Sequence, residues 1–266
     1  MSDIAKQKED HSKKETLVTY QRRLLPIAVI ETYPSQQGTL NLELIGTGAN
    51  GKDYAIKTTK DQNSNGFIPA TEVFCYELAY EISIPTPEYS ILQLRDGSLA
   101  FGSVWEGGVK GTTNLTIVAQ VLSGDLAVKG LKAFLSRAYA LDLFINNIDR
   151  HFGNYLIRES YNSHIILAYD FSLAWYAVGT PYGYEAQHPQ SNTQQWHKVI
   201  VKAGYFDVDI ARNTLTEISK IEPLIIEQIL NRIPNDWLSM DIKKDIVQWW
   251  ASSEMLTRVN RLKMEI

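Results

Sequence analysis

The stretch NNIDRHFGN, residues 146–154, decides how the rest of this 266-residue chain is interpreted. It contains one Asp, one Arg, one His and three Asn, and it follows directly on an apolar helical pattern. Asp149 and Asn154 are five positions apart, and a further acid follows at Asp170. A loop can be polar for solvation alone. An acid, an amide and a second acid in this order, however, are also typical of enzymes that transfer phosphoryl groups.

Outward from this stretch, the chain divides into two halves of different character. Residues 24–105 contain the short β-like runs LLPIAVIET, TLNLELIG and DYAIKTT, two strands around the turn RDGS, and one helical pattern, TEVFCYELAYEIS. After the glycine-rich connector EGGVKGTTN, residues 131–146 have the apolar spacing of a helix. HIILAYDFSLAW is expected to form a strand pair, 176–204 is polar and turn-prone, and helical patterns cover roughly 213–231 and 239–262. We therefore predict an α+β, two-lobed protein-kinase-like fold with a β-rich N-terminal lobe and a helical C-terminal lobe.

Domain boundaries follow from this change of character. A disordered tail is predicted at 1–16, because MSDIAKQKEDHSKKET is polar and lacks the apolar core of a signal peptide. An N-terminal lobe with a sheet, one helix and nucleotide phosphate contacts is expected at 17–106. A helical C-terminal lobe with the catalytic loop and the metal site is expected at 107–266. Within the first lobe, Thr71 is expected to cap the helix.

The composition argues against several classes of function. A net charge of −4 and a pI of about 5.8 disfavour a dedicated nucleic-acid binder, because such proteins are usually basic. No apolar stretch approaches the length of a membrane helix, so no membrane partner is expected. The single cysteine, Cys75, forms no internal disulfide, and a reducing, cytoplasmic compartment is the simplest interpretation. The five histidines lack metal-ligand spacing, and Cys75 lies in an apolar helical pattern, which disfavours a metalloenzyme and a cysteine hydrolase.

The quoted stretch fits phosphoryl transfer from ATP. That reaction needs positioned phosphates, positive charge and usually Mg²⁺ rather than covalent chemistry by the protein. Asp149 has the place of the base that takes the proton of an acceptor hydroxyl, and Asn154 that of a magnesium ligand, as in H-R-D-L-x-x-x-N. Asp170, in YDFS after the apolar run IILAY, resembles the second metal-binding acid of D-F-G, with Ser172 in place of the glycine. Each match is weak alone, but their joint order favours a kinase-like site.

The first half supplies the other parts of such a site. Lys57, in DYAIK, has the place of the strand lysine that steadies the nucleotide phosphates. Glu72 and Glu77 lie on the following helical pattern, and they point about 140° apart, so only one can face that lysine. The run GTGANG, with Gly46 and Gly48, lies between two predicted strands, where it forms either a phosphate-contacting loop or a plain hairpin turn.

The run FINNIDRHFGNYLI resembles the HipA-like kinases, bacterial serine/threonine kinases of the toxin–antitoxin type and their shorter relatives. Four residues match that family's loop: Asn147, Asp149, His151 and Asn154. TEVFCYELAYEISIPTPEY is similar to the family's glutamate helix and the strand that follows it, and FGSVWEGG to the segment that meets adenine. The likeness covers about 24–175, and on it this chain resembles a compact, stand-alone member.

The resemblance implies a role for each matched residue. It makes Asp149 the catalytic base, Asn154 and Asp170 the magnesium ligands, and Lys57 the phosphate-contacting lysine. It favours Glu72 over Glu77 as the partner of that lysine, and it implies that Asp142 orients the catalytic loop while Arg150 and His151 are structural or substrate-facing. Adenine would meet the backbone at Val104, Trp105 and Glu106. The implied cofactors are ATP and Mg²⁺.

Three functions remain open from the sequence. The first is a kinase that phosphorylates a serine or threonine of a protein substrate or partner, with a toxin-type role as one possibility. The second is a small-molecule kinase, because such enzymes share the same acids and amide. The third is a nucleotide-binding pseudokinase or regulatory partner without turnover. Retention of four candidates argues against the third function: Lys57, Asp149, Asn154 and Asp170.

Overall fold

The computed structural model describes residues 25–34, 44–60, 66–105, 110–111, 115–160 and 163–266. The predicted tail and Glu106 lie outside these ranges, as does most of the predicted strand TLNLELIG. The chain forms two compact units. The first comprises Met1–Lys57 and Glu88–Trp105, and the second comprises Thr58–Pro87 and Glu106–Ile266.

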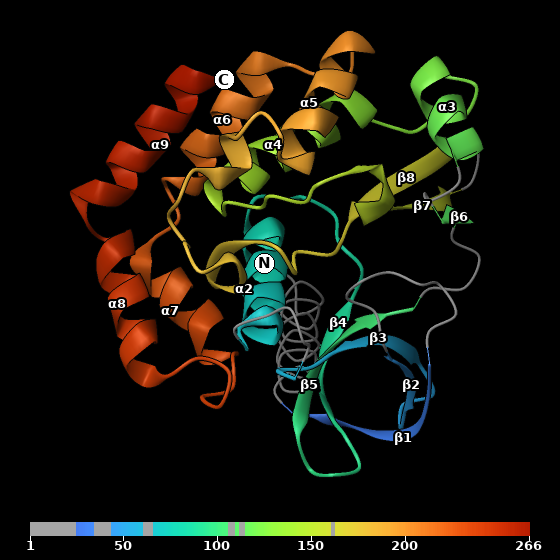
Figure 1. Cartoon of the computed structure of the whole chain (residues 1–266), viewed down its shortest axis with the longest axis vertical. Coiled ribbons are helices and arrows are strands. Elements are labelled where there is room, and N and C mark those ends of the chain that lie inside the picture. The colour runs from blue at the N-terminus through green and yellow to red at the C-terminus, as the bar shows by residue number, and fades with distance from the viewer. Residues whose placement is uncertain (1–24, 35–43, 61–65, 106–109, 112–114, 161–162) are drawn as a thin grey trace, which may run out of the picture. The chain divides into compact units, whose positions relative to one another are not determined.

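The first unit is a small closed β-barrel. Its strand order is β1-β2-β3-β5-β4, and the ring is visible in Figure 1. The barrel explains the short apolar runs of the sequence, because alternate side chains enter one small core made of Val29, Tyr54, Ile56, Leu92 and Ala100. The sequence predicted a sheet, and closure of that sheet was not anticipated. The strands are β1 (Ile27–Pro34), β2 (Leu44–Gly48), β3 (Asp53–Lys57), β4 (Tyr89–Gln93) and β5 (Leu99–Val104).

The run GTGANG forms the hairpin between β2 and β3. Gly48 N donates to Lys52 O at 2.9 Å, and Gly51 N donates to Gly48 O at 2.9 Å. A Cβ on Gly46 would lie 2.7 Å from Ile56 Cδ1 and 3.0 Å from Glu31 O, so a larger residue there would force neighbouring atoms of the barrel to shift. The run therefore forms a hairpin turn, and whether this turn also contacts phosphate stays a prediction.

In the second unit, helix α2 (Ile68–Glu81) is almost wholly buried. The prediction that Thr71 caps this helix is wrong. Phe67 is the N-cap, and Pro69 occupies the first turn, where its missing N–H leaves no bond unmade. Inside the unit, Phe74 of α2 stacks on Trp175 with ring centroids 3.9 Å apart.

The predicted helix at 131–146 is confirmed as α4 (Leu131–Phe144), which is the central helix of the second unit. It packs against α5, α6 and α9, as Figure 1 shows. The prediction that HIILAYDFSLAW forms a strand pair by itself is wrong, because its one strand pairs with a strand that precedes it in the chain. Strand β8 (Ser163–Ala168) pairs antiparallel with β7 (Tyr155–Ser160), and β6 (Lys110–Gly111) completes a sheet of order β6-β7-β8.

The helical end of the chain is divided more finely than the sequence indicated. The two long patterns correspond to four helices, which appear in orange to red in Figure 1: α6 (Val208–Ile218), α7 (Pro223–Asn231), α8 (Met240–Trp250) and α9 (Ser253–Glu265). Two helices were not predicted, α3 (Leu115–Ser123) and α5 (Asn192–Lys202), and α5 lies within the stretch expected to be turns. None of the described helices is both long and apolar enough to cross a lipid bilayer.

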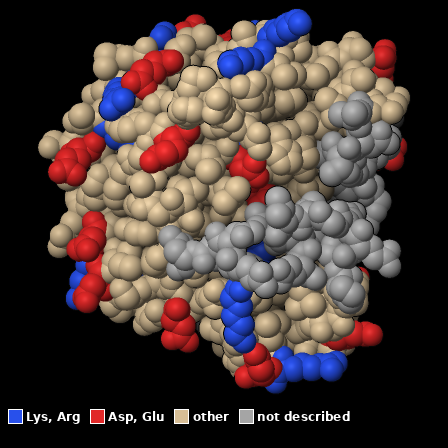
Figure 2. Space-filling view, in the orientation of Figure 1, with Lys and Arg blue, Asp and Glu red and all other residues tan. Residues whose placement is uncertain are grey.

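On the face drawn in Figure 2, acidic and basic side chains are scattered singly or in small groups over a largely uncharged surface. The domain prediction placed α2 with the barrel strands, at 17–106. The described contacts of α2 include Trp175 and Arg232 of the second unit, and the predicted boundary at 106 stays a prediction.

Candidate active site

The candidate catalytic loop, residues 146–154, begins where α4 ends. Asn146 adopts a left-handed conformation with φ of 54°, which Asn tolerates better than most residues, and the chain turns away from the helix there. The next residue, Asn147, is buried and donates from Nδ2 to Asp142 Oδ1 at 2.7 Å. Its Oδ1 accepts from Asp149 N at 3.2 Å. One amide side chain therefore fixes the candidate base relative to the helix before it.

A buried ion pair holds the same loop from the other side. Arg150 Nε lies 2.9 Å from Asp142 Oδ2, and the two side chains are only 1% and 0% exposed. Burial acts to lower the pKa of Arg150, but the Asp142 charge and hydrogen bond, together with the charges of Tyr155 and Asp170, outweigh burial and raise the pKa, so the guanidinium stays protonated. Asp142 thus contacts the 146–154 loop at both Asn147 and Arg150, and the Arg150 side chain is buried. The catalytic role of this loop stays a prediction.

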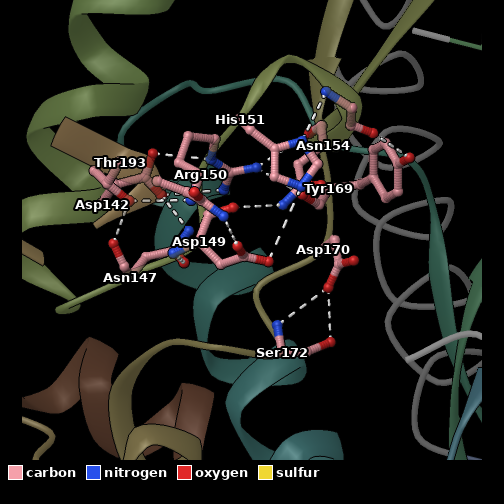
Figure 3. A network of polar contacts seen from close by, with 12 residues as sticks. Asp142, Asn147, Asp149, Arg150, His151, Asn154, Tyr169, Asp170, Ser172 and Thr193 are labelled. Carbon is pink, nitrogen blue, oxygen red and sulfur yellow. Dashed lines mark hydrogen bonds and ion pairs between the residues drawn. The ribbon is translucent and has the colours of Figure 1, made fainter. Parts of the chain in front are cut away.

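Arg150 also joins the loop to the segment that carries Asp170. Its Nη1 donates to Asn154 O at 3.0 Å and to Tyr169 O at 2.7 Å, as the dashed lines in Figure 3 show. Tyr169 N donates to Asn154 O at 3.1 Å, which extends the β7–β8 register by one pair. Asn154 and Asp170 are consequently brought to the same end of the β7–β8 ladder.

The two predicted magnesium ligands present oxygen donors, which Mg²⁺ prefers. Asn154 Nδ2 donates to Asp149 O at 3.0 Å, so the amide oxygen is the end turned away from the loop backbone. Asp170 has φ of 59°, and its Oδ1 accepts from Ser172 N at 3.2 Å and from Ser172 Oγ at 2.7 Å. In the described parts of the chain, no cluster of three or more His, Cys, Asp or Glu could hold a metal. A magnesium ion that is also bound by nucleotide phosphates requires fewer protein ligands.

The two helix glutamates have different surroundings. Glu72 Oε1 accepts from Phe171 N at 3.0 Å and from Ser172 Oγ at 3.1 Å, so it touches the residues that follow Asp170. Glu77 is buried and forms an ion pair with Arg232. This geometry favours Glu72 as the glutamate of the site.

The other predicted nucleotide-binding residues lie in the barrel. Lys57 is the last residue of β3, where it pairs with Phe101 of β5. Val104 ends β5 and donates from its N–H to Glu88 O at 2.8 Å. Trp105 N donates to Asp53 O at 2.8 Å. Their predicted contacts with phosphate and adenine, and those of Gly46 and Gly48, stay predictions.

An open groove of about 930 Å³ lies beside Asp149 in the second unit. Ile148 and Leu173 give it an apolar part, and Glu185, His188 and Arg261 contribute charged or titratable groups. Asp149 itself is partly accessible, with 28% of its side chain exposed. A substrate in this groove would therefore reach the candidate base directly.

One wall of the groove is fixed by Asn146, which the sequence analysis did not assign. Its Nδ2 donates to Thr180 O at 3.0 Å and to Glu185 Oε2 at 2.6 Å, and its Oδ1 accepts from Ala186 N at 2.9 Å. Burial acts to raise the pKa of Glu185, but backbone hydrogen bonds and the Asn146 and Thr180 side chains outweigh it and lower the pKa. The Glu185 carboxylate is therefore charged at neutral pH.

Arg258 of α9 fixes the same wall from a distant part of the chain. It donates to the carbonyls of Tyr182 and Gly183 and to those of Leu143 and Phe144 at the end of α4. Burial lowers the pKa of Arg258 to about 10, which leaves it protonated at neutral pH. The Arg258 guanidinium thus connects the end of α4 to the segment at Tyr182 and Gly183, which forms part of the groove wall.

Comparisons with known proteins give the fold. No family model and no curated protein sequence matches the chain. Among solved structures, it is similar to the Helicobacter pylori proinflammatory kinase CtkA, with a TM-score of 0.59 and 14% identity over 91% of this chain and 100% of that chain. It is also similar to HipA in the Shewanella oneidensis HipA, HipB and operator DNA complex, with a TM-score of 0.50 and 11% identity over 89% of this chain and 65% of that chain.

A third similar structure is the N-terminal 618-residue fragment of LepB from Legionella pneumophila. Its TM-score is 0.51 and its identity 14%, over 82% of this chain and 46% of that fragment. The chain thus spans all of the CtkA structure, about two thirds of the HipA chain and about half of the LepB fragment. At these identities the likeness concerns the fold, and the chain has a kinase-like α+β fold.

Proposed function

We propose that the protein is an ATP- and Mg²⁺-dependent phosphotransferase that moves the γ-phosphoryl group to a serine or threonine hydroxyl of a polypeptide. The observation that carries the proposal is the joined arrangement of Asp149, Asn154 and Asp170 on the kinase-like fold. Arg150 links these segments through Asp142, Asn154 O and Tyr169 O. A rigid set of one base and two oxygen ligands suits a reaction that depends on positioning and electrostatics.

Each residue has a defined role in the proposed reaction. Asn154 and Asp170 would hold Mg²⁺, which neutralises charge on the phosphates when bound. Asp149 accepts the proton of the acceptor hydroxyl as the hydroxyl oxygen bonds to the γ-phosphorus. The bond from that phosphorus to the β,γ-bridging oxygen breaks, and ADP leaves. Lys57 is the residue predicted to contact the phosphates.

The groove supports a polypeptide as acceptor over a small molecule. Small-molecule sites usually enclose most of the ligand surface. Here Glu185, His188 and Asn192 line the groove and are themselves solvent-exposed, so a small ligand would stay largely in water. A chain segment can lie along such a groove and place one hydroxyl at Asp149. The apolar residues beside the base, Ile148 and Leu173, would contact the residues next to that hydroxyl.

Nucleotide binding gives the first test. We expect ATP with Mg²⁺ at about 100 times its Kd to stabilise the protein by about 2.7 kcal/mol, because the nucleotide binds only the folded state. Replacement of Asp170 by Asn is expected to remove most of the additional stabilisation that Mg²⁺ gives over ATP alone. Thermal melting with ATP, with and without Mg²⁺, measures both quantities.

The matched control is Asp236→Asn, the same chemical change at an exposed position of the second unit. It should leave both melting shifts as in the wild type. Absence of any shift and of any calorimetric signal in wild-type protein with saturating ATP and Mg²⁺ would contradict the proposed function at its basis. Equal loss of the Mg²⁺-free and Mg²⁺-dependent shifts in Asp170→Asn would contradict the assignment of Asp170 as a metal ligand.

A further inference from the structure

The first turn of α5 is docked on the catalytic loop. Thr193 is fully buried, and its Oγ1 donates to Asn147 O at 2.5 Å and accepts from Arg150 N at 3.0 Å. Ser191 caps the helix by accepting from Gln194 N at 3.1 Å. The position of the helix start relative to the loop is therefore fixed by hydrogen bonds on both sides of Asp149 in the sequence.

Between the cap and the buried threonine lies Asn192, whose side chain is directed at the candidate base. Its Nδ2 donates to Asp149 Oδ1 at 2.5 Å. The other carboxylate oxygen, Oδ2, lies 4.0 Å from His151 Nε2. Asn192 is exposed and lines the groove, together with the charged residues Glu185 and Arg261. The Asn192–Asp149 hydrogen bond therefore lies at the groove in which the acceptor would bind.

We propose that Asn192 is a positioning residue, which holds the Asp149 carboxylate in the orientation that accepts the proton of the acceptor hydroxyl. This inference rests on the proposed phosphotransfer function. A base must lie within hydrogen-bond reach of its proton with the right oxygen presented. An amide donor that occupies Oδ1 leaves Oδ2 for the hydroxyl. Because Thr193 fixes α5, the amide needs no rearrangement when substrate arrives.

The inference predicts an order of activity among isosteric and truncated variants. Asn192→Ala removes the donor, and we expect kcat to fall about tenfold, because the Asp149 carboxylate loses the charge-assisted hydrogen bond that orients it. Asn192→Asp keeps the size but places a carboxylate against the base, so kcat should fall further. A purely structural role predicts the reverse order, because Asp fills the same space and suits the first turn of a helix.

The assay uses Mg·ATP and a synthetic pool of peptides that each carry one serine or threonine between randomised positions. Kinetics are then measured on the peptide that the wild-type enzyme phosphorylates fastest. The KM for ATP should change less than twofold in both variants, because Asn192 acts on the base. Asn213→Asp, the same change on an exposed position of α6, is the matched control and should behave as wild type. Suppose that the wild type is active but that Asn192→Asp has the same kcat as Asn192→Ala, or a higher one. That result overturns the inference and leaves the proposed function standing.

A stability measurement tests the contact without turnover. Asn192→Asp is made in the wild type and in Asp149→Asn, and the two changes in melting temperature are compared. The like-charge contact exists only in the first background, so Asn192→Asp should be more stabilising in the second, where the helix N-terminus alone acts on it. Equal shifts in both backgrounds show that the two side chains do not interact and overturn the inference, even if the wild type transfers no phosphate.

Discussion

Replacement of Asp149 by Asn is expected to lower kcat for phosphoryl transfer by about 10²–10⁴-fold, the range in which general bases contribute. The variant keeps the shape of the side chain and the acceptor oxygen that Asn192 contacts. Its backbone bonds to Asn147 and Asn154 do not involve the carboxylate. The loss should therefore fall on the chemical step, and the Kd of Mg·ATP should change less than about twofold, because a group that acts on the acceptor adds nothing to nucleotide affinity.

Single-turnover kinetics and calorimetry with Mg·ATP separate the two effects. The control is Asp241→Asn, at a side chain that is 95% exposed on α8, and it should retain wild-type values. Phosphorylation at the wild-type rate by Asp149→Asn, on the same peptide, would remove Asp149 from the mechanism. A matching loss of nucleotide affinity would instead assign the residue to metal or phosphate binding.

The parts of the site that the sequence indicated are those encoded close together. Asp149, Asn154 and Asp170 belong to two short motifs, and the β7–β8 hairpin between them brings the motifs together. The helix before the loop was also evident, because its apolar spacing covers four turns of α4. Local pattern is sufficient wherever the contacts that form a site are made by neighbours in the chain.

The missed parts are those that depend on distant single residues. Thr193 contacts the loop from 43 and 46 positions away, and Arg258 contacts the end of α4 from 114 and 115 positions away. Nothing in NTQQWHKVIVK marks such a role. The helix that it forms buries only Thr193, Trp196 and Ile200. Because the other residues are mostly polar, this narrow buried stripe did not indicate a helix. The Ser191 cap and the i, i+3, i+7 spacing were the available signals.

The closure of the barrel and the start of α2 were missed for a related reason. Closure depends on the β1–β4 pairing, which joins Ile27 to Leu92 across most of the first unit. Strand propensity carries no information about such a partner. At α2, Thr71 has the side chain of a cap, but the N-cap is Phe67, four residues earlier, and Pro69 occupies the first turn. The fixed φ of Pro69, which suits the first turn of a helix, therefore decided the helix start, and the capping preference of Thr71 did not.

The second large effect concerns the Asp142–Arg150 pair, and it is an effect on stability. Asp142→Leu leaves a guanidinium buried without its counter-charge, and removal of one partner from a buried pair typically costs about 3–5 kcal/mol. We expect the free energy of unfolding to fall by that amount in urea denaturation. Lys244→Met, which breaks an exposed pair with Asp241 at 3.9 Å, is the control and should change it little.

The double variant Asp142→Leu/Arg150→Met separates stability from site formation. No charge is then buried alone, so the free energy of unfolding should recover part of the loss, and the two substitutions should not be additive. Magnesium-dependent stabilisation by ATP should stay reduced, because Arg150 also holds the carbonyl of Asn154, one proposed metal ligand, and that of Tyr169, which precedes the other at Asp170. A double variant as unstable as the sum of its parts would contradict the pairing argument. One with full magnesium dependence would mean that the backbone bond between Tyr169 and Asn154 is sufficient to align the ligands.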